Sequence, residues 1–149
     1  MSQPTKEILV ATDFSEGSDE ALAAAIELAK PAGANLQLVH VLENGADQFP
    51  LGLASYEDRA ALFASLDREL ARRSDWAARE GVACQTRIIE EDAVAGILLA
   101  AREIGADLIV VGTHGRRGLA HALMGSVAER IVQRAGCPVL TVPFSRKAA

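Results

Sequence analysis

A run of four apolar residues, Leu108 to Val111, constrains the fold of this chain more than any other feature. The run shows no alternation of polar and apolar residues, which is typical of a central parallel strand covered on both faces by helices. Other strand-like segments occur along the chain, at Ile8 to Ala11, Leu36 to Leu42, Val82 to Ile89 and Val139 to Val142. The sequence therefore predicts a sheet whose central strand is buried on both sides.

Helical segments separate these predicted strands, and each shows helical apolar spacing, a capping residue or a terminating glycine. They are Ser15 to about Pro31, Tyr56 to about Glu80, Asp92 to Gly105, and Ser126 to about Arg134. Regular alternation of strand and helix predicts a single doubly wound α/β fold. We expect a Rossmann-like sheet of five parallel strands in the order 3-2-1-4-5, with helices on both faces.

Size and charge exclude several classes of protein. A length of 149 residues fits one domain, so we expect residues 1–149 to form it, with 143–149 as a short tail. The net charge of −5 offers no global positive field for nucleic acid or an anionic bilayer. The first apolar run is too short for a signal peptide, and no stretch approaches a membrane span. We therefore expect a cytoplasmic protein with no nucleic-acid partner and no membrane insertion.

The segment from Gly112 to Val127 carries the strongest indication of function. Gly112 is followed by two residues, Gly115, nine residues, Gly125 and then Ser126. Glycines allow left-handed backbone and bring N–H groups close to a polyphosphate. A helix that begins at Gly125 and Ser126 would add unpaired N–H groups and a dipole that favours an anion. This spacing is neither the Walker loop nor the dinucleotide fingerprint.

The same segment is locally positive in an acidic protein. No Asp or Glu occurs from Leu108 through Ala128, whereas the segment contains His114, Arg116, Arg117 and His121. A solvated surface loop is the simpler interpretation of a glycine-rich stretch. Its position after a central strand and before a helix favours a phosphate-binding loop instead.

Four segments of the chain, at 8–15, 107–115, 125–131 and 137–142, resemble the universal stress protein family. The spacing G-x2-G-x9-G-S resembles that of the family's ATP-binding branch, and the match covers nearly the full length. The resemblance implies an adenine nucleotide as ligand, and we expect ATP together with Mg2+ or Mn2+.

The resemblance also implies which residues form the site. Asp13 and Thr12 would lie near the ribose or a phosphate-bound metal, with Asp13 as the metal ligand, and Val41 would lie beside the adenine. The triphosphate would be surrounded by Gly112, Thr113, His114, Gly115, Arg116, Gly125, Ser126 and Val127. From local sequence alone, Asp13 is nearly as well explained by an Asx turn or a helix cap, and Val41 is better explained as a core residue.

Binding a nucleotide is better supported by the sequence than cutting one. No Ser-His-Asp arrangement can be assigned, and His114 is interpreted as a phosphate-contacting or packing residue rather than a base. The leading hypothesis is an ATP-binding regulatory stress-response protein that acts as a nucleotide-dependent switch or partner-binding module. The alternatives are a slow ATPase or autophosphorylating phosphotransferase, with Ser126 or Thr113 as acceptor, and an adaptor without nucleotide. Family precedent suggests a homodimer through Val139 to Val142, and any protein partner is unknown.

Four further residues are expected to be structural. Cys84 and Cys137 have no Cys or His at metal-ligand spacing, so we expect both to be reduced. His40 is interpreted as a satisfied core or edge residue. Trp76 is expected to pack in the structure rather than stack on a base.

Overall fold

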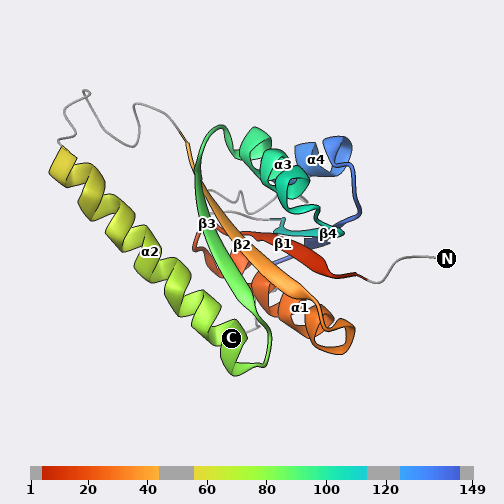
Figure 1. Cartoon of the computed structure of the whole chain (residues 1–149). Helices are drawn as coiled ribbons and strands as arrows, with labels where there is room; N and C mark the ends of the chain where they lie inside the picture. The colour runs from red at the N-terminus through yellow and green to blue at the C-terminus, as the bar shows by residue number, and fades with distance from the viewer. Residues whose placement is uncertain (1–4, 44–55, 114–124, 145–149) are drawn as a thin grey trace, which may run out of the picture.

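A computed structural model of the chain describes residues 5–43, 56–113 and 125–144 (Figure 1). Strands and helices alternate throughout these residues, as the sequence predicts. The elements are β1 Glu7–Ala11, α1 Glu16–Ala32, β2 Asn35–Leu42, α2 Tyr56–Arg79, β3 Cys84–Glu90, α3 Ala93–Ile104, β4 Leu108–Gly112, α4 Ser126–Arg134 and β5 Val139–Val142. The largest departure is at β3, which begins two residues later than predicted. The N–H of Val82 donates to Ala77 O at 2.9 Å, so this residue belongs to the turn that ends α2 rather than to the strand.

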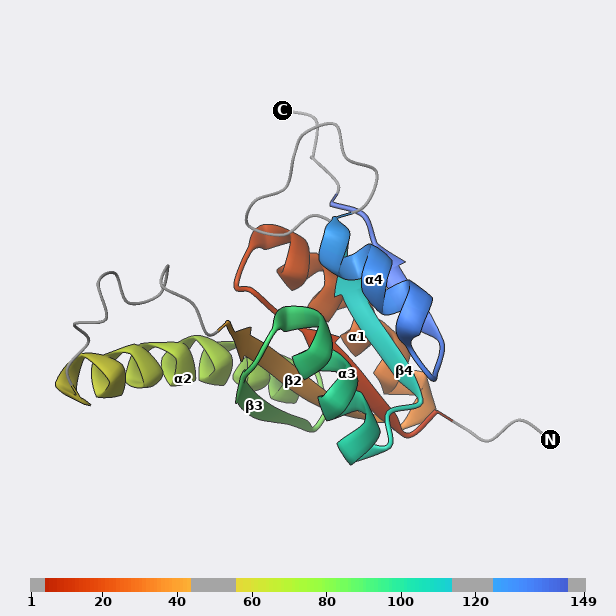
Figure 2. The same ribbon diagram turned by 90° about the horizontal axis from the view of Figure 1, so that it is seen from above.

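The sheet has five strands in the order β3-β2-β1-β4-β5, and every neighbouring pair is parallel. The predicted strand order is therefore confirmed. Helices α1 and α2 cover one face of the sheet, and α3 and α4 cover the other (Figures 1 and 2). The chain moves outward from β1 in one direction and from β4 in the other, so these two strands form the topological switch point.

Two apolar layers fill the space between sheet and helices. Ile8 and Val10 of β1 face the layer of α1 and α2, whereas Leu9 faces the layer of α3 and α4. In β4, Ile109 and Val110 are fully buried, on opposite faces. The uninterrupted apolar run is thus explained by two-sided burial.

Capping residues begin and end the helices where the sequence predicts. The side chain of Ser15 accepts a hydrogen bond from Ser18 N at 3.2 Å, and that of Asp92 accepts one from Ala95 N at 3.2 Å. Gly33 and Gly105 end α1 and α3 in the left-handed conformation, with φ of 61° and 64°. The N-cap residues lie near the carboxyl ends of the strands that precede them, and the two glycines lie near the amino ends of the strands that follow.

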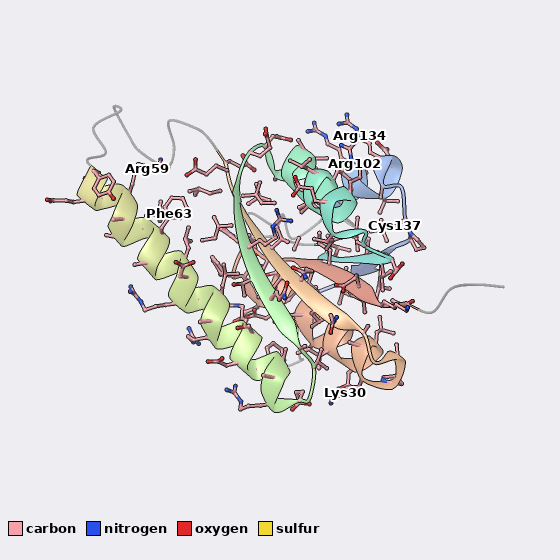
Figure 3. The ribbon with its side chains drawn as sticks, in the orientation of Figure 1. Lys30, Arg59, Phe63, Arg102, Arg134 and Cys137 are labelled. Atoms are coloured by element: carbon pink, nitrogen blue, oxygen red, sulfur yellow. The ribbon has the colours of Figure 1, made fainter. Side chains whose placement is uncertain are left out.

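Polar contacts join elements that are distant in the sequence. Lys30, labelled at the end of α1 in Figure 3, lies 2.7 Å from Glu80 just after α2. At the start of β4, the Asp107 carboxylate accepts hydrogen bonds from Glu7 N at 3.0 Å and Lys6 N at 2.8 Å. These two bonds lower the pKa of Asp107 and join the beginnings of β1 and β4.

No helix within the described ranges has both the length and the apolar character needed to cross a membrane. Trp76 is half-buried against the α1 and α2 core layer, as predicted.

The two cysteines lie at opposite edges of the sheet. Cys84 begins the edge strand β3, and Cys137 precedes the other edge strand, β5, on the side away from α2 (Figure 3). Both cysteines are free in the structure. Burial raises the pKa of Cys84 to about 11 and also raises that of Cys137.

We expect Cys84 to react with iodoacetamide at least about tenfold more slowly than Cys137 in the folded protein at pH 8. With a pKa of about 11, the reactive thiolate of Cys84 is roughly a thousandth of the total at that pH. Peptide mass spectrometry after timed labelling measures both rates in one sample, and the same labelling in urea is the control. Equal rates in the folded protein would show that Cys84 is not protected by burial.

Candidate functional site

The switch point brings together two buried threonines at the carboxyl ends of neighbouring strands. Thr12 follows β1 and Thr113 follows β4, and each of these residues is only 5% exposed. The backbone N–H of Thr12 donates to Val39 O at 2.9 Å, and that of Thr113 donates to Val142 O at 3.0 Å. The residues that follow β1 and β4 are therefore each hydrogen-bonded to the neighbouring strand. They lie at the carboxyl ends of the strands, where open α/β sheets bind ligands.

Hydroxyl groups shape the turn between β1 and α1. Thr12 Oγ1 accepts a hydrogen bond from Phe14 N at 3.0 Å and lies 3.1 Å from Ser18 Oγ. Ser18 Oγ donates in turn to Ser15 O at 3.0 Å. The structure thus places Thr12 at the site, but with its hydroxyl engaged inside the protein.

Asp13 lies at the tip of this turn, half-buried. Its Oδ1 accepts a hydrogen bond from Ser15 N at 3.0 Å, so the Asx turn considered from the sequence is present. Because a carboxylate has several acceptor positions, this bond is compatible with a second role toward a ligand. The Asx turn fixes where the carboxylate lies, next to the first turn of α1.

Phe14 has an unusual backbone conformation for its residue type. Its φ is 66°, and it is the one residue other than glycine with a positive φ in the described part of the chain. An aromatic residue in the left-handed region is strained by about 1–2 kcal/mol, so surrounding contacts must hold it there. The Phe14 ring stacks on the His40 ring, with centroids 4.4 Å apart and planes 24° apart.

His40 also contacts the backbone of the turn. Its Nδ1 lies 2.8 Å from Thr12 O, and since a carbonyl oxygen only accepts, Nδ1 must carry the proton. The prediction that His40 is a satisfied residue is confirmed. Its place against the turn was not predicted, because nothing in the local spacing connects residue 40 with residue 12.

Arg73 of α2 also contacts the turn between β1 and α1. Its guanidinium carbon lies 5.0 Å from the centre of the Phe14 ring, and Nη2 donates to Phe14 O at 3.4 Å. The group also donates to Asp19 at 2.7 Å and to Glu69 at 2.7 Å. Burial lowers the pKa of Arg73, but these charged hydrogen bonds outweigh it, so the net direction is upward.

The second part of the site is formed by the end of β4 and the start of α4. Gly112 is the last residue of β4 and does not have a positive φ, so the expectation of a left-handed backbone there is wrong. A Cβ atom at Gly112 would lie 2.9 Å from Gly17 O. Glycine is required at this position because the strand end and the first turn of α1 touch backbone to backbone.

Gly125 closes the base of the same segment. Its N–H donates to Thr113 O, and a Cβ atom added to it would lie 2.9 Å from that same oxygen. Its φ of −67° is ordinary, so close approach rather than backbone freedom explains the glycine. The two ends of the loop are thus held together by Thr113 and Gly125, whereas His114, Gly115 and Arg116 lie outside the described residues.

Helix α4 begins at this junction. Gly125 occupies the N-cap position and has no side chain to cap the first turn, and Ser126 and Val127 are exposed. The start of this helix therefore offers N–H groups that no capping side chain of Gly125 occupies. Ser126 is the first helical residue, as predicted.

Val41 lies two residues beyond Val39, which is paired with the last residue of β1, and so is level with the Asp13 turn. It is half-buried against the α3 and α4 layer. A Cβ atom at Gly96 of α3 would lie 3.1 Å from both Val41 methyl groups. Val41 thus packs against the core layer without being fully buried, and it lies beside the turn.

The described residues contain no cluster of three or more His, Cys, Asp or Glu side chains that could hold a metal ion. Asp13 alone is a poor site for a protein-bound cation. A single carboxylate does fit the way Mg2+ is held when phosphate oxygens and waters supply the other ligands.

Comparison with known proteins identifies the family. The family model described as the universal stress protein family matches residues 4–143. The chain belongs to the universal stress protein family. A universal stress protein of Methanocaldococcus jannaschii is 35% identical over 143 residues, which cover 95% of this chain and 84% of that relative.

Two solved structures of other universal stress proteins are similar to this one over almost all of their length. A universal stress protein in complex with cAMP is 26% identical, with a TM-score of 0.73, and the match covers 96% of this chain and 100% of that one. A universal stress protein from Archaeoglobus fulgidus in complex with dAMP is 25% identical, with a TM-score of 0.69, covering 93% and 98%.

Proposed function

We propose that this universal stress protein binds an adenine nucleotide, ATP, at the carboxyl ends of β1 and β4. The observation that carries the proposal is the placement, at the switch point of the sheet, of both the Asp13 turn and the start of α4. The Asp13 carboxylate suits the ribose of a nucleotide, and the N-terminus of α4 suits its phosphates. The cAMP and dAMP complexes of the two similar structures support adenine as the base.

In this proposal the described residues have distinct roles. The backbone N–H groups of Ser126 and Val127 donate hydrogen bonds to phosphate oxygens, and Gly112 and Thr113 form the wall beside the phosphates. Asp13 binds the ribose or a Mg2+ or Mn2+ ion carried by the phosphates, and Val41 contacts the adenine. His114, Gly115 and Arg116, which the structure does not describe, complete the phosphate site as the family resemblance implies.

The proposed role is regulatory. In the proposed switch, a ligand that touches both the Asp13 turn and α4 shifts an equilibrium between two states of the protein by its difference in affinity for them. The segment proposed to switch is that between Gly112 and Gly125, most of which lies outside the described residues. The loop arrangement would change the surface offered to a partner protein in a cytoplasmic stress response. We also propose a homodimer through β5, because that strand is at the edge of the sheet and Leu140 on it is 36% exposed. Sedimentation of the purified protein tests the dimer.

Isothermal titration calorimetry with ATP and Mg2+ tests the binding proposal. We expect saturable binding by the wild-type protein, and Asp13→Ala should weaken it at least about tenfold, the loss of one charge-assisted contact of roughly 1.4 kcal/mol. Asp67→Ala is the matched control, because Asp67 is exposed on α2 and takes part in none of the contacts described at the Asp13 turn. Absence of binding by the wild-type protein, or equal binding by the Asp13 variant, would contradict the assignment.

A phosphate-release assay separates a switch from a slow ATPase or an autophosphorylating enzyme. Thr113 is 5% exposed, so of the two candidate acceptors only Ser126 is accessible to a phosphoryl group. We expect bound ATP to be recovered intact. Turnover that disappears in Asp13→Ala, or phosphate found on Ser126 by mass spectrometry, would establish the enzymatic alternative instead.

A further inference from the structure

A network of charged and aromatic groups connects the outer helix α2 to the turn that carries Asp13. Arg73 lies at its centre, with its side chain 10% exposed although arginine is usually a surface residue. Within this network the guanidinium contacts Asp19, Glu69 and Phe14, and Phe14 contacts His40. Asp19 and Glu69 belong to α1 and α2, so the network spans two helices and the end of β1.

We propose that Arg73 is a positioning residue of the nucleotide site: it holds Phe14 in the left-handed conformation and thereby fixes the carboxylate of Asp13. This inference rests on the proposed function. The inference adds to the site a residue of helix α2, which none of the loops described above contains.

The first step of the reasoning concerns the backbone. Asp13 immediately precedes Phe14, so the φ of 66° at Phe14 determines the direction in which the chain leaves the Asp13 turn. A residue with a Cβ atom does not adopt this conformation without compensating contacts. If Phe14 moved to an ordinary negative φ, the hydrogen bonds from Phe14 N to Thr12 and from Ser15 N to Asp13 would be lost.

The second step concerns the contacts that hold Phe14. Arg73 binds it twice, through the ring at 5.0 Å and through the carbonyl oxygen at 3.4 Å. His40 stacks on the same ring and donates to Thr12 O, so it fixes the residue on the other side of Asp13. Asp13 is therefore held between two anchored neighbours, Thr12 and Phe14.

The third step explains why arginine suits this place. Its planar group can contact an aromatic ring and donate several hydrogen bonds in fixed directions, which a lysine ammonium cannot do together. Asp19 accepts from Nε at 2.7 Å and from Nη2 at 3.3 Å, and Glu69 accepts from Nη1 at 2.7 Å. In this orientation Nη2 also donates to Phe14 O at 3.4 Å. The two carboxylates hold the guanidinium in position rather than merely neutralising it.

The test uses Arg73→Met, which keeps an apolar stem beside Phe14 and removes the guanidinium. This variant should fold, because the side chains of Asp19 and Glu69 are 38% and 36% exposed and stay solvated without their partner. We expect ATP to bind about tenfold more weakly, the effect of losing a partly buried cation–π contact and a hydrogen bond. Arg72→Met is the matched control, since Arg72 is an exposed neighbour that also pairs with Glu69.

A double-variant comparison distinguishes positioning from a general structural role. Glycine adopts a positive φ without strain. In a Phe14→Gly background Arg73 therefore has no ring to contact, and its hydrogen bond to the carbonyl oxygen of residue 14 has no strained conformation to hold. Arg73→Met should then change the Kd for ATP by less than about twofold, because interacting residues are not additive. Arg73→Lys should restore less than half of the lost affinity. Full restoration by lysine, or an equal effect of Arg73→Met in both backgrounds, would overturn the proposal.

Hydrogen exchange of the nucleotide-free protein provides a readout that does not depend on ATP. We expect amides in residues 12–18 to exchange at least about fivefold faster in Arg73→Met than in the wild type, with those of α3 unchanged. If the wild-type protein binds no ATP, the proposed function fails while this measurement still decides whether Arg73 holds the turn. Unchanged exchange in residues 12–18 would show that it does not.

Discussion

Replacement of Gly125 by valine is expected to weaken ATP binding by about 100-fold or more, equivalent to roughly 2.7 kcal/mol. The new Cβ atom would lie 2.9 Å from Thr113 O, the oxygen that accepts the hydrogen bond from Gly125 N. The start of α4 must then move away from the end of β4, and the proposed phosphate site lies between them. Calorimetry with ATP measures the loss.

Gly136→Val is the matched control for this variant, because nothing lies within 4 Å of a Cβ atom placed at Gly136. We expect the control to bind ATP like the wild type. We expect Gly125→Val to lower the free energy of unfolding by only about 1–2 kcal/mol, since the displacement is confined to the base of the loop. Complete unfolding of Gly125→Val would assign this glycine to the core, and unchanged ATP binding would remove α4 from the site.

Replacement of Gly112 by alanine or valine is expected to lower the free energy of unfolding by about 3 kcal/mol. A Cβ atom there would lie 2.9 Å from Gly17 O and 3.1 Å from Gly17 C, so two backbone segments collide and neither can rotate away. Gly17 is in the first turn of α1, where hydrogen bonds among Thr12, Ser15 and Ser18 resist displacement. Urea unfolding followed by circular dichroism measures the change.

The comparison of alanine with valine identifies the cause. Because the collision occurs at the Cβ atom, Gly112→Ala should produce most of the loss seen for valine, while Gly136→Ala should produce almost none. If Gly112→Ala had the same free energy of unfolding as the wild type, the close contact with Gly17 would not be important for stability. Glycine would then be needed at position 112 only for ligand binding.

Much of the fold could be predicted from the sequence because its signals are local. The apolar run of β4 indicated burial on both faces, and Ser15 and Asp92 marked two helix starts that the structure confirms. Strand order followed from the regular alternation of strands and helices and from the family resemblance. The burial of β4 and the two helix starts depend on residues that are close together in the chain, whereas the strand order does not.

The contacts within the candidate site could not be predicted in the same way, because they join residues far apart in sequence. Arg73 meets Phe14 across 59 positions, and His40 meets Thr12 across 28. Gly112 was interpreted as a source of backbone freedom, whereas its neighbour in space is Gly17. A glycine needed for a left-handed turn and one needed for close packing look identical in a sequence.

Analysis of nucleotide carried by the purified protein tests the central claim most directly. The protein is denatured, the released small molecules are separated by chromatography and identified by mass spectrometry, and ATP is then titrated into nucleotide-free protein. We predict that the wild-type protein releases an adenine nucleotide or binds ATP saturably at cellular concentrations. We predict that Gly125→Val neither carries the nucleotide nor binds ATP at those concentrations. Finding neither in the folded wild-type protein would contradict the assignment of the β1 and β4 edge as a nucleotide site.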